Sequence, residues 1–399
     1  MKQNEYDFLI IGAGVIGFAV GIALLEENPR LKVIIAEKEK SLGVHASGRN
    51  SGVIHAGFYY SPNSLKAKFC KQGNAELREL IKKYQIPILE IGKVVVTKSE
   101  QELVGLNKLF KSGSANDIEI ELLDAGKLHK LEPLAITHEQ FIWSPNSCVS
   151  DPNLIINALR TKFELLGGQL KLDCKIELIE RFNEVIGSPN SITAKFFINA
   201  AGAYSDKLWE GLSLKTEYQM IPFLGMYKST NFHALPIKRL IYPVPHPINP
   251  FLGVHFTLTL KNKVKIGPTA IPIFGKEQYS INSKLNAKEL IQTFQGIYAL
   301  IRGDKHSFTE LIKTEWPKFY KKRLVKESSR IVPAAINVKS WENSKSGIRS
   351  QLVDLKNGEL VQDFVVKRYL NSIHVLNAVS PGWTSALPFG RYIAELARK

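Results

Sequence analysis

The chain has 399 residues, 44% of them hydrophobic, and a formal net charge of +16 at pH 7. These values exclude an intrinsically disordered protein, and the length favours two domains over a single core. The excess charge comes mostly from lysines dispersed along the chain, which is typical of a solvated surface, so nucleic-acid binding is not expected.

The cysteines and histidines indicate neither a disulfide framework nor a metal centre. Cys70, Cys148 and Cys174 are far apart, and the nine histidines form no HxxxH or paired Cys/His pattern. The N-terminal segment lacks the basic region of a signal peptide. We therefore expect no metal, free thiols and a cytoplasmic location.

The N-terminal segment carries the pattern of a dinucleotide-binding unit. An apolar strand over 8–11 runs into the turn Gly12, Gly14 and Gly17, followed by an apolar helix and a second strand that ends at Glu37. In such units the glycines permit a tight turn, close approach to a pyrophosphate and close helix packing, while the acid accepts hydrogen bonds from a ribose. Unpaired amides at the helix N-terminus favour the phosphates.

The same stretch could also be interpreted as a membrane anchor. The uncharged run Phe8–Leu25 has the minimum length for crossing a bilayer. The glycine spacing and the acidic neighbours Asp7, Glu26 and Glu27 argue against this interpretation.

Further elements return the chain to the nucleotide-binding unit after an excursion. A helix opens at Asp151–Pro152, where Asp is a good N-cap and Pro suits the first turn. A later strand leads into the small-residue turn at Asn199–Gly202. The expected elements in this half are helices 64–84, 100–111 and 152–166 and strands 92–97, 169–172 and 192–198.

The stretch 215–335 has strands separated by turns. Leu252–Leu260 alternates apolar and polar residues and pairs through a short turn with 264–267, which predicts a hairpin in a sheet with one covered face. Helices are expected over 287–301 and 315–326. Two strands, 364–367 and 373–377, a turn at 380–382 and a C-terminal helix follow, so a second helix terminus would point at the same cofactor.

Eight segments stand in an order that is found in a known family: Arg49–Gly57, Tyr59–Tyr60, Ser64–Lys68, Gly92–Lys93, Tyr242–Pro245, Pro250–Thr257, Gly347–Arg349 and Thr384–Ala386. Together they resemble the L-2-hydroxyglutarate oxidase/dehydrogenase family of FAD enzymes, part of the D-amino-acid oxidase-like group. The resemblance implies FAD, oxidation of L-2-hydroxyglutarate to 2-oxoglutarate by hydride transfer from C2 to flavin N5, and an acceptor other than NAD, such as a quinone chain or oxygen. The single GxGxxG unit also favours FAD over NAD, because an enzyme that uses both nucleotides would need a second such unit.

We therefore predict an α/β protein, α+β overall, in which a Rossmann-like FAD-binding domain is interleaved with an antiparallel-sheet substrate domain. The FAD-binding domain is expected over 1–90, 145–215 and 336–399, and the substrate domain over 91–144 and 216–335. The expected cofactor-binding residues are Gly12, Gly14, Gly17, Glu37, Lys38, Ser47, Asn50, Ser51, Gly52, Ala201, Gly202, Gly382, Thr384 and Ser385.

The chemistry needs a carboxylate partner and a base for the hydroxyl proton. Arg349 can bind a carboxylate bidentately, and His55 and His255 both titrate near neutrality, so either could be the base. Tyr60 and Tyr242 are expected to donate hydrogen bonds to the substrate. Either Lys66 or Lys93 could bind the distal carboxylate, and no spacing selects between them.

Three residues depart from the family pattern. Arg49 replaces a usual His and excludes a histidyl-flavin bond there, His246 replaces an Asp, and Trp383 lies in a turn expected over the flavin. Such changes can retune substrate choice, so another small 2-hydroxy acid, a D-amino acid or glycerol 3-phosphate remains an alternative substrate. A flavin-binding protein without activity is a further alternative. The cluster Lys318–Lys326, with Phe319, Tyr320 and Leu324 among its bases, also suits a peripheral membrane contact on the inner face of the membrane.

Overall fold

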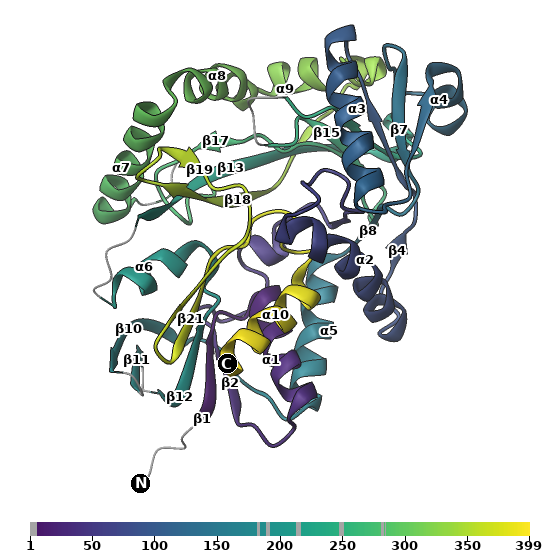
Figure 1. The fold of residues 1–399 in the computed structure, drawn as a ribbon. Helices are drawn as coiled ribbons and strands as arrows, with labels where there is room; N and C mark the ends of the chain where they lie inside the picture. The colour runs from purple at the N-terminus through teal and green to yellow at the C-terminus, as the bar shows by residue number, and fades with distance from the viewer. Residues whose placement is uncertain are drawn as a thin grey trace.

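The computed structural model describes residues 6–181, 184–188, 192–212, 217–246, 251–280, 283 and 285–399. Two large sheets, one of 8 and one of 10 strands, form the frame of the molecule, and a 3-stranded sheet lies among the other elements. Each large sheet packs against its own helices, and separate hydrophobic clusters fill the two halves (Figure 1). The architecture is the predicted mixture of a nucleotide-binding sheet and a second, mostly antiparallel sheet.

The first sheet has a parallel centre. The strand β1 lies between β2 and β12 and is parallel to both, while β21 extends the parallel order beside β12. This confirms the strand, turn, helix and strand expected at the N-terminus. The strands are β1 (Tyr6–Ile11), β2 (Val33–Ala36), β9 (Gln169–Lys171), β10 (Lys175–Arg181), β11 (Glu184–Ser188), β12 (Ile192–Asn199), β20 (Val365–Tyr369) and β21 (Ser372–Asn377).

Helix α1 is buried on almost all sides, which explains its uniformly apolar sequence. Helices α5 and α10 pack against it, and Phe18 contacts Phe163 edge to face at 5.9 Å between ring centroids. The run Phe8–Leu25 is therefore a strand, a turn and a buried helix. No helix in the described part of the chain has the length and apolarity needed to cross a bilayer. The helices of this half are α1 (Val15–Glu27), α2 (Leu65–Lys83), α5 (Pro152–Leu165), α6 (Ser205–Glu210) and α10 (Ala386–Arg398).

The second sheet is antiparallel except where β14 lies parallel to β5. Its two long strands, β13 and β18, pair along most of their length. The strands are β5 (Lys93–Val96), β6 (Glu121–Asp124), β7 (Gln140–Ser144), β13 (Tyr218–Asn231), β14 (Leu240–Pro243), β15 (His255–Leu258), β16 (Lys263–Gly267), β17 (Ile271–Pro272), β18 (Glu342–Asp354) and β19 (Glu359–Leu360). The small sheet contains β3 (Val53–Ile54), β4 (Ile88–Leu89) and β8 (Cys148–Ser150).

Strand β18 belongs to the second sheet, although the predicted segment 336–399 assigned it to the FAD-binding domain. The chain thus crosses between the sheets after β18 rather than before it. The domain boundaries stay a prediction. The helices that flank the second sheet are α3 (Glu100–Ala115), α4 (Ala125–Leu131), α7 (Ala287–Gly303), α8 (Lys305–Glu315) and α9 (Lys321–Ser328) (Figure 1).

Two local predictions for this half were wrong in part. The expected helix over 315–326 is the end of α8, a short 3-10 turn (Trp316–Phe319) and α9, because Pro317 cannot donate the next helical hydrogen bond. The hairpin of β15 and β16 is confirmed, but its polar face is not in solvent. His255 is only 4% exposed because it faces an interior cavity, so both faces of the strand are covered.

Gly12 is the position at which the first turn depends most on glycine. Its φ is +107°, and an added Cβ would lie 2.5 Å from the Ala200 carbonyl oxygen. We expect Gly12→Ala to lower the free energy of unfolding by about 3 kcal/mol and to reduce bound FAD, measured by urea denaturation and flavin absorbance.

Gly167→Ala is the matched control. Its φ is +91°, but no atom lies within 4 Å of an added Cβ. In this variant the free energy of unfolding should fall by only about 1 kcal/mol, which is the cost of a left-handed backbone for alanine, and FAD should stay bound. Equal losses in the two variants would show that the contact with Ala200 is unimportant.

Candidate active site

A cavity of about 880 Å³ is lined by residues from both large sheets. The glycine turn after β1 and the end of β2 line it on the side of the first sheet. Strands β13, β15 and β18 contribute side chains on the other side. Because the carboxyl ends of β1 and β2 open into this cavity, it lies where open α/β sheets bind their ligands.

The end of the cavity nearest the glycine turn has the donors and acceptors of a nucleotide site. Gly14 caps α1 without a side-chain cap, and the Val15 amide donates to Ser47 Oγ at 3.2 Å. The Glu37 carboxylate accepts from the Ala13 amide at 2.9 Å and from the Glu39 amide at 3.0 Å. A carboxylate has about four lone-pair sites, so Glu37 retains acceptors for ribose hydroxyls. These residues fit FAD.

Lys38 is held in an ion-pair cluster that connects the two halves of the chain. Its Nζ bonds to Glu39, to Glu277 Oε1 at 2.6 Å and to His45 Nε2 at 3.0 Å. His45 Nδ1 lies 2.8 Å from the Tyr279 hydroxyl. The two carboxylates and the imidazole could also ligate a cation, but the Lys38 ammonium already provides the compensating charge.

Arg349 is a buried cation of the cavity wall that has no carboxylate partner among the described residues. It lies on β18 opposite Phe223 of β13, with its guanidinium carbon 4.7 Å from the centre of the Phe251 ring. Its buried Nε makes no hydrogen bond, and no carboxylate in the described part of the chain forms an ion pair with it. Burial lowers the pKa of Arg349 only to about 10, so it stays charged. A buried charge without a partner favours an anionic ligand.

His255 is positioned as a neutral base. Its ring stacks on Tyr242 with centroids 3.8 Å apart, and its Nδ1 lies 2.9 Å from the Gly253 carbonyl oxygen. A carbonyl can only accept, so this contact assigns the proton to Nδ1 and leaves Nε2 with a free lone pair. Burial lowers the pKa of His255 to about 3, with a further contribution from Lys93, so the ring is neutral near pH 7.

His55 lines the same cavity and is held by its main chain. Its amide donates to Thr384 Oγ1 at 3.2 Å, and its carbonyl accepts from Asn74 Nδ2 at 3.0 Å. Burial lowers the pKa of His55 well below the usual value, and the charges of Lys93 and Arg349 add to this effect. Both histidines are therefore neutral in the folded protein.

The cavity gathers most of the predicted site residues. Those that line it are Gly12, Gly14, Glu37, Lys38, Ser47, Asn50, Ser51, Ala201, Gly202, Gly382, Thr384, His55, His255, Arg349 and Tyr242. Gly17, Gly52, Ser385 and Tyr60 are not among the lining residues. Gly52 packs β3 against β8, since an added Cβ would lie 2.2 Å from the Ser150 carbonyl oxygen. The roles of all these residues stay predictions.

Neither lysine proposed for the distal carboxylate lines the cavity. Lys66 lies near the rings of Tyr60 and Phe364, at 5.9 and 6.0 Å from their centroids. Lys93 lies behind His55 and Tyr242. No feature of the sequence shows that these two lysines lie near the cavity and not in its wall.

Two of the three departures from the family pattern are in the cavity wall. The Arg49 guanidinium donates to the carbonyls of Val44 and Ser346 at 2.6 and 3.1 Å and stacks on Tyr279 at 3.9 Å. Trp383 also lines the wall, and its buried Nε1 makes no hydrogen bond. His246 is exposed and lies outside the lining.

Sequence reasoning missed several wall residues. They are Tyr204, Tyr227, Phe251, Lys276, Glu277 and Tyr279. Phe251 stands in the segment Pro250–Thr257, which carries the family resemblance, but no motif marks the others. The meeting of the two sheets brings the residues of the second half to the nucleotide side, namely Tyr227, Phe251, Lys276, Glu277 and Tyr279. Aromatic and charged residues near the predicted hairpin were the sole signal available.

The chain belongs to the FAD-dependent oxidoreductase family, whose DAO model matches residues 7–396. L-2-hydroxyglutarate dehydrogenases are among its relatives, and at 32 to 35% identity over nearly the whole chain it belongs to their family. The protein of Indibacter alkaliphilus is 35% identical, and the match covers 99% of this chain and 99% of the relative. The mitochondrial protein of Caenorhabditis elegans is 34% identical over 98% and 93%, and that of Escherichia coli K12 is 32% identical over 98% and 92%.

Solved structures share the fold. The FAD-bound L-alpha-glycerophosphate oxidase of Mycoplasma pneumoniae has a TM-score of 0.78 at 24% identity and covers 100% of this chain and 96% of its own. Glycine oxidase from Geobacillus kaustophilus has a TM-score of 0.73 at 18% identity, with 99% and 95% covered. At these identities the likeness concerns the fold alone. The family and the nucleotide half of the cavity together assign FAD as the cofactor.

Proposed function

We propose that this protein oxidises L-2-hydroxyglutarate to 2-oxoglutarate. The observation that carries the proposal is the unpaired guanidinium of Arg349 in one cavity with the neutral His255 and the nucleotide cradle. The names of the relatives support the substrate. FAD supplies a two-electron acceptor when bound, and the residues of this chain bind, orient and deprotonate the substrate.

Arg349 is the partner for a substrate carboxylate. A guanidinium binds a planar carboxylate through two parallel hydrogen bonds, which fixes both the position and the orientation of the acid. The buried Tyr242 hydroxyl has no hydrogen-bond partner and lines the same cavity, so it can donate to a substrate oxygen. The two groups together hold C2 in one orientation, which is the basis of stereochemical choice.

His255 is the base in this proposal. The hydroxyl proton of the substrate passes to Nε2 of His255 as the C2 oxygen becomes the carbonyl, and FAD, when bound, would take up the hydride from C2. The Nδ1 contact of His255 with Gly253 keeps the Nε2 lone pair available. The net change is a two-electron oxidation with loss of one hydride and one proton.

The first prediction concerns Arg349. Arg349→Met should lower kcat/KM for L-2-hydroxyglutarate at least about a hundredfold, and Arg349→Lys should lose less because a point charge remains. The measurement is steady-state oxidation with a dye acceptor. Arg391→Met is the matched control, because Arg391 pairs with Glu76 at the surface. An unchanged kcat/KM in Arg349→Met would contradict the assignment.

The second prediction concerns the base. Because burial holds the pKa of His255 near 3, the neutral form persists on acidification, and the rate of flavin reduction should not fall between pH 7 and pH 5. His255→Asn should lower this rate by about a hundredfold to ten-thousandfold, and His55→Asn by less. The test is anaerobic stopped-flow absorbance. A larger loss in His55→Asn would assign the proton to His55, and a decline centred near pH 6.5 would contradict a base that is held neutral by burial.

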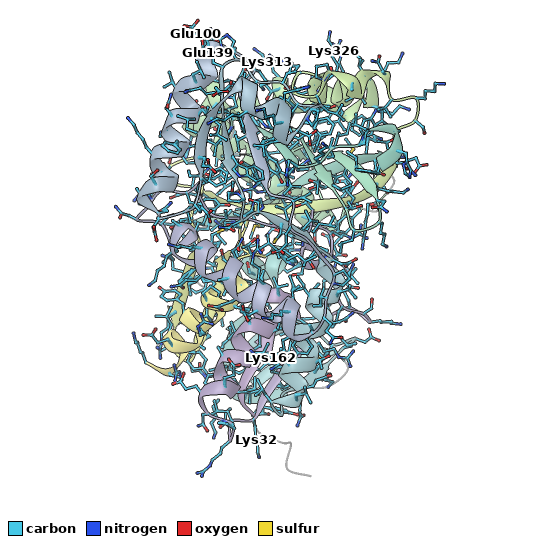
Figure 2. All side chains as sticks on the ribbon, turned by 90° about the vertical axis from the view of Figure 1, so that its right-hand side faces the viewer. Lys32, Glu100, Glu139, Lys162, Lys313 and Lys326 are labelled. Atoms are coloured by element: carbon cyan, nitrogen blue, oxygen red, sulfur yellow. The ribbon has the colours of Figure 1, made fainter. Side chains whose placement is uncertain are left out.

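The electron acceptor belongs to the same proposal, and the surface favours a membrane quinone over oxygen. On α7, Ile291, Phe294 and Tyr298 are 59%, 53% and 68% exposed and share one helical face. Trp316 and Tyr320 are 55% and 65% exposed beside α9. Figure 2 shows Lys313 and Lys326 at one end of the molecule, opposite Lys32. The exposed cations of α9 are Lys321, Lys322, Arg323 and Lys326.

Aromatic side chains with adjacent cations, as Trp316 and Tyr320 beside α9, are typical of a surface that binds anionic lipids. We expect the FAD-loaded protein to sediment with vesicles that contain phosphatidylglycerol and far less with neutral vesicles. Trp316→Ser with Tyr320→Ser should weaken this binding about tenfold. Val104→Ser is the control, since Val104 is 77% exposed on α3. Equal sedimentation of all variants, or none with anionic vesicles, would leave oxygen or a protein as the acceptor.

A further inference from the structure

Lys93 is a fully buried lysine whose charge has no acidic partner. It opens β5 between β14 and β7, and its side chain is 0% exposed. Its Nζ lies 4.4, 5.2 and 5.6 Å from the ring centres of Tyr242, Tyr59 and Phe58. No ion pair of Lys93 exists in the described part of the chain. Ring faces attract an ammonium, so this aromatic enclosure partly offsets the cost of burial.

The polar contact of this ammonium is with His55. Lys93 Nζ lies 3.4 Å from His55 Nδ1. An ammonium donates hydrogen bonds and accepts none, so Nδ1 of His55 is the acceptor and the ring proton lies on Nε2. His55 itself lines the cavity whereas Lys93 does not. The lysine therefore acts on the site through the histidine.

The two histidines of the cavity then have opposite hydrogen-bonding roles. The Gly253 carbonyl holds the proton of His255 on Nδ1, which makes its Nε2 an acceptor. The Lys93 ammonium makes Nε2 of His55 a donor. One imidazole can take a proton from the substrate, and the other can hydrogen-bond a substrate oxygen as charge develops on it.

We propose that Lys93 is a positioning residue that fixes His55 as a hydrogen-bond donor, so that His255 alone accepts the substrate proton. The effect of Lys93 on catalysis rests on the proposed function. The tautomer of His55 does not depend on that function. It replaces the prediction that Lys93 binds the distal carboxylate.

The arrangement has a pH limit on its alkaline side. Burial lowers the pKa of Lys93 to about 7, so above that pH the neutral amine can accept as well as donate, and it no longer holds Nδ1 of His55 as an acceptor. Burial raises the pKa of Cys70 to about 12 and that of Cys148 to about 11, and it also raises the pKa of Tyr59 and Tyr242. The groups that face Lys93 are His55, Tyr59, Cys70, Cys148, Tyr242 and His255. None of these six groups changes charge near neutrality, so Lys93 is the group of this cluster that does.

The test is the tautomer of His55 in the FAD-loaded protein. Protein labelled with ¹⁵N-histidine is examined by long-range ¹H–¹⁵N correlation, and His55→Asn assigns the signal. We expect an unprotonated Nδ1 and a protonated Nε2 at pH 6, and a shift of population to Nδ1–H in Lys93→Met. A proton on Nδ1 of the wild type, or the same tautomer in both proteins, would overturn the proposal.

Two further measurements complete the test. Lys93→Met should slow flavin reduction about tenfold to hundredfold with little change in substrate dissociation constant, and it should abolish the decline expected above pH 7 in the wild type. Lys265→Met is the matched control, since Lys265 lies 5.8 Å from the Tyr227 ring on the same sheet.

If Lys93→Met does not fold, titration of the wild-type His55 signal from pH 6 to pH 9 decides. A tautomer that does not respond would overturn the proposal, and a correct tautomer with no flavin reduction would refute the function alone.

Discussion

Buried positive charge without a matching anion is the constraint on which the active site depends. Burying an ion costs several kcal/mol unless a partner compensates it, and proteins retain such groups where a ligand supplies that partner. Arg349 is the clearest case, with a buried Nε that makes no hydrogen bond. Burial, with the nearby charges of Lys93 and Arg349, keeps His55 neutral, and burial with Lys93 keeps His255 neutral. The buried cations therefore both attract an acid and leave His255 able to accept a proton.

The two sheets must meet for this site to exist. The parallel order of β2, β1 and β12 directs the glycine turn and Glu37 to one side of the cavity. The pairing of β13 with β18 brings Arg349 to the other. The cluster of Lys38, Glu39 and Glu277 connects the halves beside the nucleotide end. One sheet thus supplies the residues of the cofactor end of the cavity, and the other supplies those of the substrate end. Substrate residues can therefore differ between enzymes that share the fold and the cofactor.

Features with local causes could be predicted from the sequence. Glycine spacing, capping residues and alternation predicted the first βαβ unit and the β15–β16 hairpin. Pro317 could have predicted the break after α8, since its ring prevents a continuous helix. The covered polar face of β15 could not be predicted, because its burial depends on a cavity between distant segments.

The same limit applies to individual site residues. His55, His255 and Arg349 stand in recognisable segments, and the structure brings all three to one cavity. Tyr60 and Lys93 stand in equally recognisable segments and lie outside its wall. A motif identifies that a residue is near the site, but which atoms reach the cavity depends on packing against side chains far away in sequence.

Anaerobic flavin reduction by the two enantiomers of 2-hydroxyglutarate tests the central claim most directly. The purified FAD-loaded protein is mixed with each enantiomer, and the visible absorbance of oxidised flavin is followed. The account predicts rapid bleaching with the L form and none with the D form. A flavin that stays oxidised with the L form, yet is bleached by a D-amino acid or glycerol 3-phosphate, would contradict it.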